Sequence, residues 1–366
     1  MSKSKNLADE LFPEPDLYDS EEVLDIPPNQ RKLHTESYDY SISTIYEYLK
    51  SEHIYIPRYQ RSYVWDRSQA SKLIESLVIQ CPIPILYLEQ SYDSRFSVID
   101  GNQRLTSIKL FLNDEFSLKG LTAYPELDGL FWSDLDPRIQ RHIKNRTLRC
   151  IAILPDTHPQ IKFDVFERLN TGSVKLNSQE LRHGIYHGPL IDKVEKLAKS
   201  AKWKEVTRIK ADKRMRRSEL VLRYLAMAND LESYFKPLTG FLNQFAEKYQ
   251  FASSETLEKF EDDFTQAVEK IHTLYGDLSF RPFNHEFKAQ NAINTALLDA
   301  QMIAVHRLER PLHSFSQRER EKLWKATADL FDERDFSMTI GAGTSSRSSV
   351  LGRIEKFSVF LNEQLG

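Results

Sequence analysis

The stretch SVIDGNQRLTSIKLFLN, residues 97–113, decides how the N-terminal half of this chain folds. Its first apolar run stops at Asp100, and a helical rhythm then starts, with Leu105, Ile108 and Leu112 at i, i+3 and i+7. This pattern predicts a strand that ends at Asp100, a tight turn, and a helix. Gly101 suits the turn because glycine adopts positive φ without steric cost.

The polar residues of this turn support two interpretations. The N-terminus of a helix presents unpaired N–H groups and the positive end of the helix dipole, so it attracts anions. Arg104 adds a planar cation suited to phosphate, and Asn102 and Gln103 add amides. Asp100 suits a magnesium ion, a water molecule or a role as a base, and it equally suits capping of the helix. Anion binding and plain turn formation both stay open, and no GxxxxGK[ST] loop occurs in the chain.

A second motif, IPRYQRSYVWD, spans residues 56–66. Arg58, Tyr59, Gln60 and Arg61 combine guanidinium groups with an aromatic ring and an amide, which suits base stacking and phosphate binding. The alternative, which we favour for Trp65, is that Tyr63, Val64 and Trp65 fill the core beside the next helix.

A third motif, FERLNTGSVKLNSQELRHGIYHG, spans residues 166–188. Asn170 fits a helix C-cap, while Asn177 and Glu180 form a variant of the capping box. All of these residues have a structural interpretation beside the functional one. His183 and His187 lie four apart on a predicted helix, but no third ligand accompanies them, so we predict no metal site.

The order of apolar patterns predicts a mixed fold of the α+β or α/β class. Strands and helices alternate to about residue 190, and the remainder is almost entirely helical in pattern. We therefore expect an acidic flexible leader at 1–38, a mixed domain at 39–190 and a helical domain at 191–366. Residues 1–40 carry ten acidic and four basic side chains, consistent with such a leader.

A basic stretch lies at residues 193–217, with eleven Lys or Arg against three acidic residues. Such a segment can follow a DNA phosphate backbone without reading sequence, or it can be a solvated helical face with a basic loop. The candidate DNA-binding residues are Lys210, Lys213, Arg214, Arg216 and Arg217.

The bulk composition excludes several classes of protein. The net charge of −3 does not fit a wholly basic protein that coats DNA. The sequence contains no run of about 18 apolar residues, so we predict no helix that spans a membrane. The N-terminus lacks a signal-peptide pattern, so we expect a protein of the reducing cytoplasm. Cys81 and Cys150 each lie in an apolar run, and we predict that both thiols are buried.

Taken in order, the three motifs resemble the N-terminal domain of GmrSD-type modification-dependent restriction enzymes, which is related to the ParB/sulfiredoxin fold. The later segments RRSELVLRYLA (216–226) and FSMTIGAGTSSRSSVLGRIEKF (336–357) also fit the helical remainder of that family. Two departures stand out. Asn102 replaces the first glutamine of the family's DGQQR motif, and we find no HNH nuclease signature, since FNHEF (283–287) lacks the partner residues.

The resemblance implies binding and hydrolysis of a nucleoside triphosphate (GTP, ATP or CTP) with Mg²⁺, in defence against phage. It implies DNA as a partner, with cleavage by a separate nuclease subunit, and it leaves a homo-oligomer open. Alternatives are a non-enzymatic DNA-binding adaptor and a stand-alone ParB-like nuclease. The catalytic residues that it implies are Asp100, Gln103 and Arg104. The nucleotide-binding residues that it implies are Arg58, Tyr59, Gln60, Arg61, Gly101, Asn102, Thr106, Asn170 and Glu180.

Overall fold

A computed structural model of the chain describes residues 31–57, 63–169, 176–212, 214–308, 315–341 and 345–365. All the elements below lie within the unit Lys32–Gly366.

One mixed sheet forms the N-terminal part, with strand order β1-β5-β3-β4-β2. β1 pairs antiparallel with β5, β3 pairs parallel with β5 and antiparallel with β4, and β2 pairs parallel with β4. The sheet and the helices after it confirm the mixed fold class. The strands are β1 (Thr35–Ser41), β2 (Ile54–Tyr55), β3 (Leu86–Gln90), β4 (Phe96–Asp100) and β5 (Thr147–Ile153).

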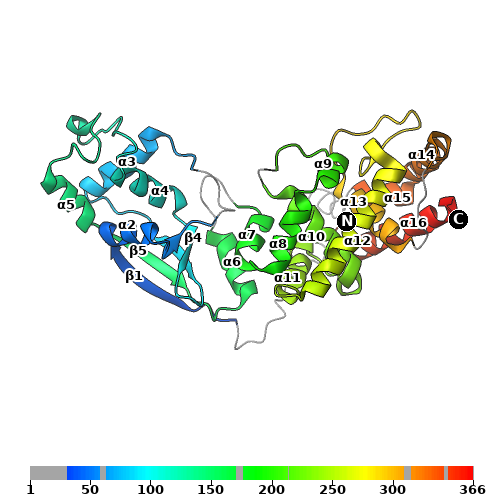
Figure 1. The fold of residues 1–366 in the computed structure, drawn as a ribbon, viewed down its shortest axis with the longest axis horizontal. Helices are drawn as coiled ribbons and strands as arrows, with labels where there is room; N and C mark the ends of the chain where they lie inside the picture. Colours follow the sequence, from blue (N-terminus) through cyan, green and yellow to red (C-terminus); the bar gives the residue numbers. More distant parts are fainter. Residues whose placement is uncertain are drawn as a thin grey trace, which may run out of the picture. The chain divides into compact units, whose positions relative to one another are not determined.

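Side chains of the central strands point alternately to the two faces of the sheet, and a different set of helices packs against each face. On one face Leu88, Val98 and Cys150 are fully buried in a cluster with four helices. On the other face Ile99 and Ile153 belong to a cluster that includes α6 and α7. Figure 1 shows the helices of the first set, labelled α2 to α5, beside the strands. The first set is α2 (Ile42–Lys50), α3 (Arg67–Val78), α4 (Asn102–Leu112) and α5 (Pro137–Asn145), and the second is α6 (Pro159–Leu169) and α7 (Ser178–Ile185).

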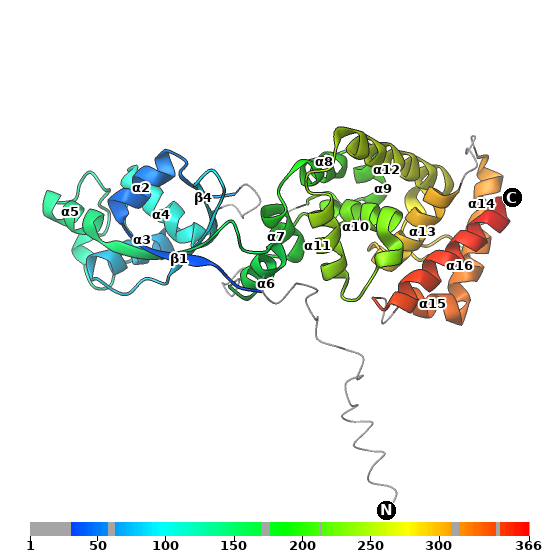
Figure 2. The same cartoon turned by 90° about the horizontal axis from the view of Figure 1, so that it is seen from below.

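The rest of the described chain is helical and has its own apolar core. In α13 every residue from 296 to 305 is buried, because this helix packs against α10, α12 and α16. Figure 2 shows α15 and α16 next to each other in this part. The helices are α8 (Pro189–Ala198), α9 (Ala201–Thr207), α10 (Arg216–Asp230), α11 (Leu238–Lys248), α12 (Ser254–Tyr275), α13 (Thr295–Arg307), α14 (Gln317–Asp332), α15 (Arg334–Gly341) and α16 (Arg347–Leu365).

A buried charge cluster joins three of these helices. Asp299 of α13 accepts two hydrogen bonds of 2.5 Å from Arg223 of α10 and one of 2.6 Å from Arg353 of α16. Asp299 is 2% exposed and Arg353 is fully buried. No helix in the described ranges is long and apolar enough to cross a membrane.

Most of the elements expected from periodicity are present, and the differences have local causes. Residues 35–38, which we counted with the leader, belong to β1, which pairs along its whole length with β5. β3 begins only at Leu86, because the prolines at 82 and 84 have no N–H to donate to a ladder.

The prediction for Cys81 was wrong, whereas that for Cys150 is confirmed. Cys81 is exposed: it follows the end of α3 and a left-handed residue, Gln80 (φ 61°), and precedes a proline. Cys150 lies in the middle of β5 and is fully buried. Its burial raises the pKa of the thiol to about 12.

Candidate functional site

The turn between β4 and α4 has a geometry that only glycine fits. Gly101 has φ 106° and ψ 7°, and it occupies the N-cap position of α4. A Cβ at this position would also clash with Cδ2 of Leu86. The N-cap position of α4 makes no side-chain hydrogen bond. The carboxylate of Asp100 accepts a hydrogen bond from the Arg104 side chain instead. The capping interpretation of Asp100 is therefore wrong.

Asp100 is instead bound to Arg104, one helical turn later. Nη2 of Arg104 donates to Oδ2 of Asp100 at 2.6 Å. Nη1 donates to the carbonyl oxygens of Pro84 and, at 3.3 Å, of Ile85. Arg104 is 9% exposed, and its burial lowers the pKa of the guanidinium while Asp100 opposes that shift. Arg104 thus connects the turn to the two residues that precede β3, and its side chain points into the protein and not towards solvent.

The Asp100 carboxylate is still accessible from solvent. Its side chain is 43% exposed although Oδ2 is bound to Arg104. Beside it, Oγ1 of Thr106 donates to Oδ1 of Asn102 at 3.1 Å across the first turn of α4. The turn therefore presents an anchored carboxylate and an amide oxygen at the start of a helix.

Gln103 connects this turn to the end of the second motif. Its Oε1 accepts from the backbone N–H groups of Val64 at 2.9 Å and Trp65 at 3.2 Å. The hydroxyl groups of Tyr63 and Ser107 lie 2.9 Å apart. Trp65 packs against the sheet-domain core, as we favoured, and Tyr63 is half-buried. The core prediction for Val64 was wrong, because this side chain is 58% exposed. The structure therefore brings the first and second motifs together, although Arg58, Tyr59, Gln60 and Arg61 lie outside the described residues.

The third motif forms a complete capping box. The side chain of Asn177 accepts from the N–H of Glu180, and the carboxylate of Glu180 accepts from the N–H of Asn177 at 2.7 Å. The same carboxylate lies 3.3 Å from Arg214, whose carbonyl accepts from Asn177 at 2.8 Å. Glu180 is buried, and these contacts are structural ones. Asn170 lies outside the described part of the chain.

The two histidines of this motif each face a carboxylate. His183 Nδ1 lies 3.0 Å from Glu195 Oε1, and His187 Nε2 lies 3.8 Å from Asp192 Oδ1. The hydrogen bond with His183 lowers the pKa of Glu195 to about 2, against the opposing effect of burial. Over the described ranges, no group of three or more His, Cys, Asp or Glu side chains could hold a metal ion.

Many cations of the basic stretch are held in ion pairs. Lys193 and Lys196 both contact Glu261 of α12, at 2.9 Å in the case of Lys196. Lys199 lies 3.3 Å from Glu195, and Lys202 lies 3.1 Å from Glu205. The solvated-face interpretation therefore accounts for much of α8 and α9.

The candidate DNA-binding residues differ in exposure. Lys210 and Arg216 are exposed, whereas Arg217 is 9% exposed and donates to the carbonyl of Ile209 at 3.0 Å. Arg214 is half-exposed at its side chain and paired with Glu180. Lys213 falls in a gap of the described ranges.

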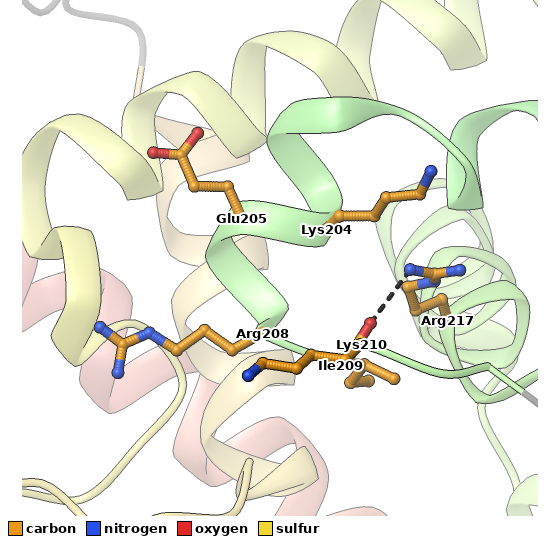
Figure 3. A pocket seen from close by; sticks show the side chains of 6 residues that line it. All are labelled: Lys204, Glu205, Arg208, Ile209, Lys210 and Arg217. Carbon is orange, nitrogen blue, oxygen red and sulfur yellow. Dashed lines mark hydrogen bonds between the residues drawn. The ribbon is translucent and has the colours of Figure 1, made fainter.

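A pocket beside these residues contains two cations that the sequence did not single out. Lys204 of α9 and Arg208, the residue that ends this helix, line it. The only feature of the sequence that pointed to Lys204 and Arg208 was their position within the basic stretch at 193–217. Figure 3 shows them with the other lining residues.

The chain thus combines a mixed sheet with its helices, a strand–glycine–helix junction, and a helical remainder. The family model of the N-terminal domain of the GmrSD restriction endonuclease matches residues 42–187, from the start of α2 to just after α7. This segment of the chain is similar to a GmrSD N-terminal domain, and the similarity suggests a role in a restriction system and an interaction with DNA. No curated protein matches the chain.

Proposed function

We propose that the protein is a nucleoside-triphosphate-binding and -hydrolysing sensor of a GmrSD-type restriction system, which senses or acts on DNA while a partner chain cleaves it. The observation that carries this proposal is the β4–α4 junction. A left-handed glycine there starts a helix without a side-chain cap, beside an exposed carboxylate. N–H groups at such a helix start favour phosphate.

The hydrolysis that we propose is a transfer of the terminal phosphoryl group to water. Positioning and charge neutralisation dominate reactions of this type. Asp100 orients the attacking water or a metal ion, and the start of α4 receives the phosphate oxygens. Arg104 keeps Asp100 in place and adds positive charge behind it. Gln103 is the second polar group of the site and anchors Val64 and Trp65 beside it.

The residues of the junction fit a magnesium ion. Asp100 and Asn102 supply hard oxygen ligands, which Mg²⁺ prefers. Only Oδ2 of Asp100 is bound to Arg104, so the carboxylate can hold the ion through its other oxygen. Mg²⁺ is commonly held by one or two carboxylates together with substrate phosphates and water. When bound, it would neutralise charge on the triphosphate.

The other residues of the proposed nucleotide site follow from the family. Arg58, Tyr59, Gln60 and Arg61 would contact the base and the phosphates, and Gln103 holds the segment that follows them. Gly101 and Thr106 belong to the junction itself, and Asn170 and Glu180 would close the site.

For DNA, we propose that Lys210, Lys213, Arg214, Arg216 and Arg217 contact backbone phosphates. Support comes from the exposure of Lys210 and Arg216 and from the charge of the stretch. Neutralising one cation that binds a phosphate should reduce the slope of log affinity against log salt by about 0.9.

A non-enzymatic DNA-binding adaptor is the second candidate. The inward orientation of Arg104 favours it, because a guanidinium bound to Asp100 and to two carbonyl groups is less available to a transition state. In that case the junction would hold a DNA phosphate without turnover. A stand-alone nuclease is the third alternative and predicts metal-dependent DNA cleavage by the chain alone.

The test is phosphate release from GTP, ATP and CTP with Mg²⁺, with and without DNA. Asp100→Asn should abolish release. The matched control is Asp39→Asn, because Asp39 is also an exposed aspartate bound to an arginine, Arg149, in the same sheet. Equal release from wild type and Asp100→Asn would refute the proposed site. No release from any nucleotide, with salt-dependent DNA binding retained, would favour the adaptor.

A further inference from the structure

We propose that the pocket between α9 and the start of α10 is a second anion site, which binds a phosphate ester and is separate from the β4–α4 junction. Its volume is about 570 Å³, within the usual range for ligand pockets. Its lining residues are Lys204, Glu205, Arg208, Ile209, Lys210 and Arg217.

The charge of the lining is strongly positive, with four basic side chains against one acidic one. Glu205 is already compensated, because it lies 3.1 Å from Lys202 and 3.0 Å from His272. Arg208 is paired with the exposed Asp277. In Figure 3, Glu205 and Lys204 leave α9 in different directions.

The two lysines of the pocket supply the excess charge. Among the described residues, no acid lies within ion-pair distance of Lys204 or Lys210. Both side chains are exposed, so an incoming anion can reach their ammonium groups. The pocket therefore combines accessible cations with a concave wall.

Arg217 supplies a fixed cation at that wall. It is 9% exposed, and its Nη1 donates to the carbonyl of Ile209 at 3.0 Å, the bond drawn in Figure 3. Asp212 lies 3.5 Å from Nε, too far for a normal hydrogen bond, and Nε has no hydrogen-bond partner among the described residues. A buried N–H of this kind costs free energy unless a partner satisfies it. The guanidinium therefore acts on the pocket through its positive charge at the wall, next to Asp212.

A second buried arginine lies behind α9. Arg281 is 3% exposed and donates to the carbonyl of Thr207 at 2.8 Å and to that of Ser279 at 2.7 Å. Burial lowers the pKa of its guanidinium, and the nearby Arg208 lowers it further. Its hydrogen bonds go to carbonyl groups and not to a carboxylate. Its positive charge therefore adds to the potential of the pocket.

Two non-glycine residues with positive φ lie at the ends of the loop that carries Lys210. Arg208 has φ 56° and Met215 has φ 54°. Such residues occupy a sparsely populated backbone region and cost about 1–2 kcal/mol each. Arg208 ends α9 in this conformation and lines the pocket.

A phosphate ester fits this lining better than a bare anion. The volume accommodates a sugar and a base as well as a phosphate, and Ile209 offers an apolar surface. The ester can be that of a free nucleotide or that of the DNA backbone. Only in the second case does the inference rest on the proposed DNA function, and in neither case does it depend on hydrolysis at Asp100.

The experiment measures protection of individual lysines in the full chain. Wild-type protein is acylated with an amine-specific reagent, and the rate at each lysine is read by mass spectrometry. Three samples are compared: no ligand, a nucleoside monophosphate without Mg²⁺, and a single-stranded DNA of about 20 nucleotides, longer than a typical single-strand binding site. Lys322 and Lys325 of α14 serve as controls in the same sample, since both lie outside the pocket and reach solvent.

We expect Lys204 and Lys210 to react several-fold more slowly with ligand, while the two control lysines keep their rates. Protection by the monophosphate identifies a free nucleotide, and protection by DNA alone identifies the backbone. The double variant K204E/K210E should weaken binding of the protecting ligand about tenfold, equivalent to about 1.4 kcal/mol, and K322E/K325E should leave it unchanged.

Unchanged acylation at Lys204 and Lys210 with both ligands would overturn the proposal, as would equal protection of all four lysines. Asp100→Asn separates the two sites. If it abolishes hydrolysis but retains protection, the two sites are independent, and if it removes protection, the lysines report only the junction.

Discussion

Replacement of Gly101 by alanine tests whether the β4–α4 junction is as constrained as its geometry implies. The variant adds one methyl group at a position with φ 106°, where an L-residue is strained. The same methyl group overlaps Cδ2 of Leu86, a side chain that is 1% exposed in the core of the sheet domain. Leu86 cannot move away easily because its surroundings are densely packed.

The two contributions have separate magnitudes. The left-handed backbone costs about 1–2 kcal/mol for a residue with a Cβ. Overpacking of a dense core costs about 1–3 kcal/mol more. We therefore expect Gly101→Ala to lower the free energy of unfolding by about 2–5 kcal/mol.

Gly129 provides the matched control. It also has a positive φ, 86°, but a Cβ there would meet no atom within 4 Å. Gly129→Ala should therefore cost only the backbone contribution, about 1–2 kcal/mol. The difference between the two variants isolates the contact with Leu86.

Urea unfolding measured by circular dichroism gives both values. In the background of Leu86→Ala, which creates space, Gly101→Ala should cost about 1–3 kcal/mol less than in the wild type. If Gly101→Ala costs no more than Gly129→Ala, or if the Leu86→Ala background gives no relief, then the close packing at this junction is refuted.

Three further predictions concern other parts of the chain. Asp299→Ala removes the carboxylate that pairs with the buried Arg353 and the partly exposed Arg223, and should destabilise the helical domain by about 3–5 kcal/mol in urea unfolding. A decrease below about 1 kcal/mol would contradict this prediction. His183 lowers the pKa of Glu195 to about 2 from an ordinary value of 4.5, so this carboxylate contributes stability above pH 4.5 that disappears as the pH falls towards 2. The stability difference between wild type and Glu195→Gln should therefore shrink over that range, and a constant difference would argue against the pair. A thiol reagent should label Cys81 but not Cys150 in the native protein, and both after unfolding; native labelling of two thiols would contradict the burial of Cys150.

Local features were predictable from the sequence because their physical cause lies within a few residues. The strand–glycine–helix order at Gly101 follows from an apolar run, a residue that permits positive φ and a helical rhythm. The capping box of Asn177 and Glu180 likewise depends on residues three apart. The assignment of these residues to a nucleotide site came from resemblance, and it stays a prediction.

Long-range partners were not predictable, because one sequence does not say which distant atoms meet. Glu75 illustrates this: its Oε1 accepts from three successive backbone N–H groups at 122–124, more than forty positions away. The pairing of β1 with β5 likewise joins residues more than a hundred positions apart.

The sequence by itself determined the order of elements, the glycine at the junction, the helix caps and the concentration of charge at 193–217. Only the tertiary structure decided that Arg104 faces Asp100 and the carbonyls before β3, that Glu180 is paired with Arg214, and that Lys204 and Lys210 remain without acid partners in the described chain. The reason is that backbone preferences act between neighbours, whereas the direction of a charged side chain is set by the desolvation and partners that packing provides.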